Sequence, residues 1–166
     1  MRITWIGLGL AGLIAVSMPG AAQQVTGDTE LQLQGSLSLA TSSAKDSSGT
    51  VDVRYGRFLT DLQQAGFETS LQVTGHNKVG GYGGPFYRYN FSTGKLVPYI
   101  GATAAVAFGH SDFGKGGRFN AEGGFRYFLD RRTAFTAAGT TGYSFDSHTW
   151  DKGVQVLFGF SHLWGR

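Results

Sequence analysis

Several residue types that support whole classes of function are missing or scarce in this chain. It contains no cysteine, which excludes disulfide scaffolds, thiol catalysis, cysteine-ligated zinc and a lipid-modified N-terminal cysteine. Charged residues make up 15% of the chain, whereas soluble domains average roughly 25%. The net charge of +3 comes without a basic cluster, so nucleic acid is not an expected partner. No residue pattern calls for a cofactor.

Long hydrophobic runs are also absent beyond the first 22 residues. The longest weakly polar run covers 99–109, which is shorter than the roughly 17 residues that a helix needs to cross a bilayer. Glycine supplies 27 of the 166 residues and recurs every few positions, and this disfavours helices. The chain nevertheless has 13 Phe, 7 Tyr and 3 Trp, so it is not expected to be disordered.

The first 22 residues have the composition of a secretory signal peptide. Met1-Arg2 is followed by an apolar stretch to Met18, and small residues precede Gln23. This order of a positive start, an apolar run and a small-residue exit is typical of a cleaved signal. We therefore expect residues 1–22 to be removed and residues 23–166 to form one domain.

The rest of the chain alternates between apolar and polar residues with a period of two, the period of a β-strand. In the stretch 30–40, for example, leucines fall on one face and glutamines and serines on the other. Eight such segments are present, at 30–40, 51–59, 67–74, 86–91, 97–108, 119–128, 133–145 and 153–164. Longer connections (40–50, 75–84, 109–118 and 146–152) alternate along the chain with shorter ones (60–66, 92–96 and 129–132). The pattern predicts an all-β, eight-stranded, antiparallel up-and-down barrel.

The distribution of residue sizes indicates which face of each strand points outward. The polar faces combine a few charges with Gly, Ser, Thr, Gln and Asn, whereas the apolar faces are bulky and end in aromatic residues. Small polar residues suit the narrow inside of an eight-stranded barrel, and aromatic residues at strand ends suit membrane interfaces. The sequence therefore predicts a transmembrane barrel, whereas a soluble barrel would carry charges over its exterior.

Three segments resemble a known family, the small eight-stranded outer-membrane β-barrel proteins of Gram-negative bacteria, close to the OmpA/OmpX-like barrel domain. They are 55–61 (YGRFLTD), 96–102 (LVPYIGA) and 121–130 (AEGGFRYFLD), which look like the family's strands and periplasmic turns. The resemblance covers the whole chain after residue 22 and implies an outer-membrane location. It also implies assembly by the barrel-assembly machinery through the C-terminal strand. Family members usually end on an aromatic residue, whereas this chain runs two residues past Trp164.

The charged residues on the polar faces are the main candidate site. Arg54, Glu68, Arg88, Glu122 and Arg126 have the opposite parity to their bulky apolar neighbours. We expect them to point into the lumen and to pair with one another, since an unpaired buried charge costs several kcal/mol. Three positive and two negative charges leave a small positive excess, which Asp52 would offset if it lies deep enough in the lumen. Asp52 is a further acid on the same faces, near a strand end.

Basic residues in or beside the longer connections form a second candidate site, for contacts with lipopolysaccharide phosphates. They are Lys45, Lys78, Lys115, Arg118 and Lys152. The alternative interpretation is that they only keep exposed loops soluble. The preferred function is a monomeric, non-enzymatic barrel that supports the envelope or binds a partner through its loops. A narrow small-solute channel and a lipid A-modifying enzyme, for which His110, Ser111 and Asp112 are the best local residues, are the alternatives.

Overall fold

A computed structural model describes residues 24–38, 48–74, 78–109, 116–145, 148–150 and 154–165. The expected signal peptide, residues 1–22, lies outside these ranges. The strands are β1 (Thr29–Ser38), β2 (Ser48–Phe58), β3 (Gln63–Thr74), β4 (Lys78–Asn90), β5 (Leu96–Gly109), β6 (Gly117–Phe128), β7 (Thr133–Ser144), β8 (Thr149–Trp150) and β9 (Gln155–Trp164). No helix among the described residues is long and apolar enough to cross a membrane.

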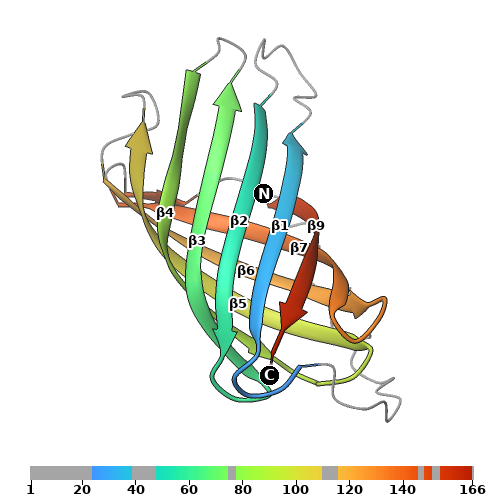
Figure 1. Ribbon diagram of the computed structural model, residues 1–166. Coiled ribbons are helices and arrows are strands. Elements are labelled where there is room, and N and C mark those ends of the chain that lie inside the picture. Colours follow the sequence, from blue (N-terminus) through green and yellow to red (C-terminus); the bar gives the residue numbers. More distant parts are fainter. Residues whose placement is uncertain are drawn as a thin grey trace, which may run out of the picture.

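The strands form one antiparallel sheet that closes on itself (Figure 1). Each strand from β1 to β7 pairs with the next, and β9 pairs with both β7 and β1. The two-residue β8 also pairs with β7, beyond the end of the β7–β9 ladder, so β8 and β9 share one position in the barrel. The predicted closed eight-stranded antiparallel barrel is confirmed.

The two ends of the barrel differ in their connections. Short turns join β2 to β3, β4 to β5 and β6 to β7 at one end, which we name the turn end. The start of β1 and the end of β9 lie at this same end, because Thr29 pairs with Trp164. The opposite end, which we name the loop end, carries the connections 39–47, 75–77 and 110–116. Figure 1 shows the turn end at the bottom and the loop end at the top.

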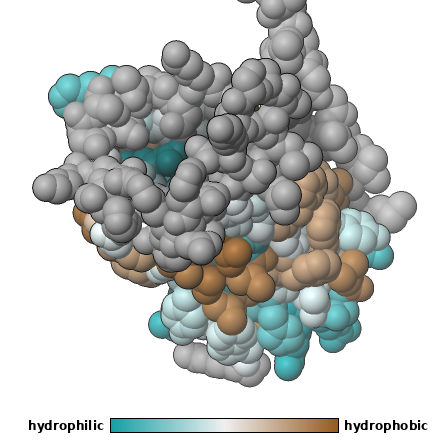
Figure 2. All heavy atoms as spheres, turned by 90° about the horizontal axis from the view of Figure 1, so that it is seen from above, coloured by the Kyte–Doolittle hydropathy of each residue, from teal (hydrophilic) through white to brown (hydrophobic). Residues whose placement is uncertain are grey.

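Residues alternate between the outside and the inside of the barrel along each strand. In β1, Leu31 and Leu33 are exposed by 43% and 57%, whereas Gln32 and Gln34 are buried. The exposed large side chains on the other strands are mostly apolar or aromatic, as in Val53, Phe67 and Phe160. Seen from the loop end, hydrophilic residues are visible in a hollow, and hydrophobic residues gather on the outer side, next to hydrophilic ones (Figure 2). This inverted polarity is that of a barrel surrounded by lipid.

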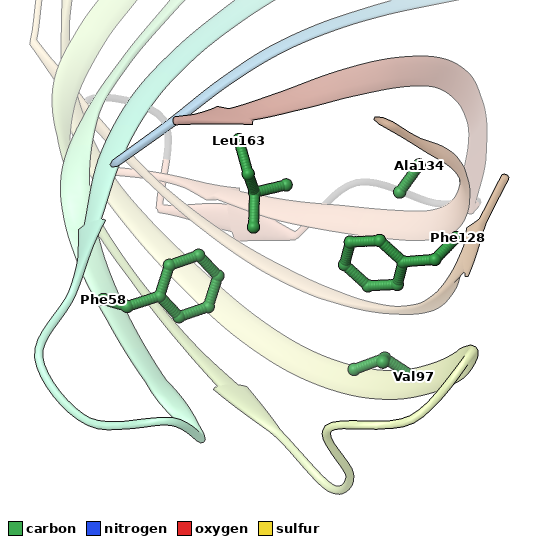
Figure 3. Close-up of a cluster of buried hydrophobic side chains, with 5 residues drawn as sticks. All are labelled: Phe58, Val97, Phe128, Ala134 and Leu163. Carbon is green, nitrogen blue, oxygen red and sulfur yellow. The ribbon is translucent and has the colours of Figure 1, made fainter. Parts of the chain in front are cut away.

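An apolar cluster fills part of the lumen at the turn end (Figure 3). Its members come from five strands and are almost completely buried: Phe58, Val97, Phe128, Ala134 and Leu163. We name it the turn-end cluster. Leu163 is an apolar residue on the otherwise mostly polar inward face of β9. It is apolar because it packs in this cluster. Leu157, the other exception on β9, packs with Tyr99 and Ala138 in a second buried cluster.

The segment Gly80-Gly81-Tyr82-Gly83-Gly84 corrects an expectation about the connections. The sequence assigned it to a long connection, but it lies inside β4 and pairs with β3 throughout. A Cβ on Gly84 would collide with the backbone carbonyl of Ala104. Glycine therefore allows β4 and β5 to approach closely at this point, which a pattern based on polarity alone does not reveal.

The close approach at Gly84 generates a prediction about stability. Gly84→Ala should destabilise the barrel by about 1–3 kcal/mol, because the added methyl group overpacks the β4–β5 contact. Gly49→Ala is the matched control, since a Cβ there meets nothing within 4 Å. Urea unfolding of both variants in lipid vesicles measures the difference. Equal unfolding midpoints for the two variants would contradict this interpretation of Gly84.

Candidate functional site in the barrel lumen

The five charged residues expected in the lumen come from four strands and lie on their inward faces. Arg54 belongs to β2, Glu68 to β3, Arg88 to β4, and Glu122 and Arg126 to β6. Arg88 and Arg126 are completely buried, and the side chains of the other three are at most 6% exposed. The structure therefore places all five together inside the barrel, away from the surrounding lipid.

Arg54 joins two of the carboxylates. Its Nε lies 2.5 Å from Oε2 of Glu68, and its Nη1 lies 2.7 Å from the carboxylate of Glu122. The first pair follows directly from register, because Arg54 and Glu68 are opposite each other on β2 and β3. Thr103 on β5 donates a hydrogen bond of 3.1 Å to the same Oε2 of Glu68. Burial removes water from the guanidinium and from both carboxylates, and these contacts replace the lost hydrogen bonds to water.

Arg88 occupies the space between the carboxylates of Glu122 and Glu30. Its Nη2 lies 3.5 Å from Glu122 and its Nη1 lies 3.7 Å from Glu30. It also donates hydrogen bonds to Gln32, at 2.7 Å, and to Gln64, at 3.2 Å. The centre of its guanidinium is 4.3 Å from the ring centroid of Tyr99, which adds a cation–π contact.

Glu30 is the member of this arrangement that the sequence analysis missed. Its carboxylate receives Nη1 of Arg126 at 2.9 Å and the amide of Gln64 at 2.5 Å. The parity of β1 held the signal, because Glu30 lies on the same face as Gln32 and Gln34. We name the six residues Glu30, Arg54, Glu68, Arg88, Glu122 and Arg126 the lumen charge network. Its three positive and three negative groups balance without help from Asp52.

Arg126 links the lumen charge network to the turn end of the barrel. Its Nη2 donates to Oδ1 of Asn90 and to Oε1 of Gln24, both at 2.6 Å. Its guanidinium centre lies 5.4 Å from the ring of Phe58 and 5.7 Å from that of Phe128. The buried charges therefore continue directly into the turn-end cluster.

The positions expected to contact lipopolysaccharide are only partly described. Lys45, Lys115 and Lys152 lie outside the described residues, and Lys78 begins β4. Arg118 is the second residue of β6 and lies beside the connection 110–116. Its Nε donates to Oδ1 of Asn120 at 2.8 Å, and its guanidinium lies over the ring of Tyr82. Arg118 makes these inward contacts because it lies on the same face of β6 as Glu122 and Arg126.

The residues considered for catalysis, His110, Ser111 and Asp112, lie outside the described residues. Within the ranges that the structure describes, no group of three His, Asp or Glu side chains is arranged to hold a metal ion. The chemistry available inside the described barrel is that of paired charges and amides.

An apolar outer surface around a polar, charge-filled interior defines the class of this protein, an eight-stranded transmembrane β-barrel. Solved structures share this fold. The N-terminal β-barrel domain of Pseudomonas aeruginosa OprF is similar, with a TM-score of 0.62, 18% identity and coverage of 85% of this chain and 100% of that one. Neisserial surface protein A has a TM-score of 0.53 and 14% identity, with coverage of 81% and 94%.

The outer membrane protein OprG of Pseudomonas aeruginosa is a further structural neighbour. It has a TM-score of 0.52 and 12% identity, with coverage of 87% of this chain and 99% of that one. No protein-family model and no curated protein sequence matches the chain. At these identities the neighbours establish the fold, and the roles of individual residues depend on the geometry described above.

The pairing pattern predicts that Glu30 and Glu122 differ in how much they contribute to the stability of the barrel. Glu30→Gln leaves Arg126 without a carboxylate among the described residues, which should destabilise the barrel by about 3–5 kcal/mol. Glu122→Gln should cost less, because Arg54 keeps Glu68 and Arg88 keeps Glu30. Urea midpoints of the two variants in vesicles provide the measurement. A midpoint for Glu122→Gln at or below that of Glu30→Gln would refute this assignment of partners.

Proposed function

We propose that this chain is an outer-membrane barrel with a closed lumen, which supports the envelope or binds a partner through its loop end. The observation that carries the proposal is the filling of the lumen by side chains. The lumen charge network occupies the interior, and the turn-end cluster lies below it. A solute could pass only after buried ion pairs had separated, and breaking such pairs is costly.

The width of the barrel supports the same conclusion. An eight-stranded barrel has an interior just wide enough for side chains to fill. Arg88 and Arg126 are the largest fully buried side chains of the described chain, and each spans part of the lumen. Guanidinium groups that bond to several strands act as internal cross-links. Such cross-links suit a barrel that supports the envelope or that holds binding loops in place.

The outer-membrane location is part of the proposal, and the apolar exterior and the structural neighbours support it. In that setting Lys45, Lys78, Lys115 and Lys152 are the candidate contacts for lipopolysaccharide phosphates. The strand β9, which ends at Trp164, is the candidate signal for the barrel-assembly machinery. We propose that the barrel acts as a monomer, without catalysis and without a cofactor.

A narrow channel for small solutes is the second candidate, and one observation favours it. The amide of Gln34, Nε2 of Gln32 and Oγ1 of Thr136 are buried without a hydrogen-bond partner among the described residues. They lie on β1 and β7, the two strands that flank β9. Buried polar groups are usually satisfied, so this wall suits water or a small polar solute.

Conductance separates the two candidates. The purified full chain in planar lipid bilayers should show no large, steady current, because the lumen charge network and the turn-end cluster block the pore. An eight-stranded barrel of known pore activity serves as the positive control for insertion. Large and sustained conductance from the unmodified protein would overturn the closed-lumen proposal and favour the channel.

The orientation of the barrel is tested with protease on intact cells. The start of β1 and the end of β9 both lie at the turn end, so we expect this end to face the periplasm and the loop end to face outward. Trypsin should then cut near Lys45, Lys115 or Lys152 and spare Arg131 and Arg132 in the β6–β7 turn. Cleavage confined to Arg131 and Arg132 would reverse the orientation, and recovery of the protein without detergent would exclude the membrane location.

A further inference from the structure

Residues 24–28, which precede β1, fold back beneath the turn end of the barrel as a reverse turn. The N–H of Asp28 donates to the carbonyl of Val25 at 3.0 Å, and the N–H of Val25 donates to Oδ2 of Asp28 at 3.0 Å. Gly27 has a φ of +93°, as the third residue of a type II turn requires. The turn reverses the chain, so that Gln24 is directed toward the barrel.

The turn is attached to the rim of the barrel beside the end of β2. The N–H of Gly27 donates to the carbonyl of Phe58, and the N–H of Phe58 donates to the carbonyl of Asp28, each at 2.8 Å. The N–H and Oγ1 of Thr26 both donate to Oδ1 of Asp61, at 2.8 and 2.7 Å. These bonds hold the pKa of the Asp61 carboxyl below its usual value, so the acceptor is charged at neutral pH.

Gln24 precedes the first strand, and yet its side chain is buried and hydrogen-bonded. Its side chain is completely buried. Its Nε2 donates to the carbonyls of Asp61, at 2.9 Å, and Ser92, at 3.2 Å, and its Oε1 accepts from Nη2 of Arg126 at 2.6 Å. One amide therefore joins the β2–β3 turn, the β4–β5 turn and the inward face of β6.

This amide complements the turn-end cluster. Arg126 bonds to Gln24, and its guanidinium also lies over the rings of Phe58 and Phe128. The apolar side chains close their part of the lumen, and Gln24 meets the backbone carbonyls that the cluster does not cover. The barrel itself closes through the β1–β9 ladder, in which residues 24–28 take no part. The seal is thus an addition to a sheet that is already closed.

We propose that residues 24–28 form a plug that seals the turn end of the lumen and keeps water and small ions away from Arg126 and Glu30. The plug is held by hydrogen bonds to two turns, to Arg126 and to Phe58 at the end of β2. It takes no part in the β1–β9 ladder, so it can leave without opening the barrel. This inference rests on the proposed closed lumen and assigns its seal at the turn end to one segment.

The test compares ion conductance of the full chain with that of single variants in planar bilayers. Gln24→Ala should raise the frequency of brief, small-ion openings about tenfold, which corresponds to losing about 1.4 kcal/mol of hydrogen bonding. Thr26→Val keeps Gln24 but removes one bond to Asp61, and it should give a smaller rise. Val25→Ala is the matched control, because Val25 is 49% exposed in the same segment. It should behave as the unmodified chain.

Two further measurements keep the result interpretable. Intact mass must show the same N-terminus in every variant, and migration on unheated gels must show a folded barrel. If Gln24→Ala fails to fold, the decision falls to Thr26→Val. Folded variants that are as tightly closed as the unmodified chain would overturn the plug. Steady, large conductance from the unmodified chain would instead overturn the closed-lumen proposal itself.

Discussion

Hydrocarbon offers no hydrogen bond, and the architecture of this barrel depends on that constraint. Every backbone group of the membrane-spanning strands must find its partner within the sheet, which the closure of β1 against β9 provides. Charged side chains at the same depth have no place on the outside, so they are directed inward. Because the interior of eight strands is narrow, six such groups come close enough to compensate one another.

The narrow lumen also allows the guanidinium groups to link strands across the barrel. Arg54 links β2 to β3 and β6, and Arg126 links β6 to β1 and β4, so each guanidinium joins strands that are far apart in sequence. A lumen filled in this way gives a rigid support for the connections at the loop end. Rigid strands that carry variable connections are the usual arrangement by which one fold serves many binding roles.

The turn end of the lumen and one wall of the barrel are built differently. At the turn end, apolar side chains and the amide of Gln24 meet around Arg126. On the wall formed by β1, β7 and β9, polar side chains such as Gln34 and Thr136 have no partner among the described residues. The closure that we propose therefore depends mainly on the apolar cluster and the hydrogen-bonded groups near the turns.

The sequence by itself determined the fold class, the strand order and the direction in which Arg54, Glu68, Arg88, Glu122 and Arg126 point. The fold class and the directions of these side chains follow from a period-two pattern that assigns alternate residues to lipid or lumen. The strand order follows from the alternation of longer and shorter connections. Only the tertiary structure decided which charges pair, because the height of each residue depends on strand register and tilt. It also revealed Glu30 as the partner of Arg126, Gly84 as a strand contact, and the burial of Gln24. Those contacts join residues that are distant in sequence, so no local pattern records them.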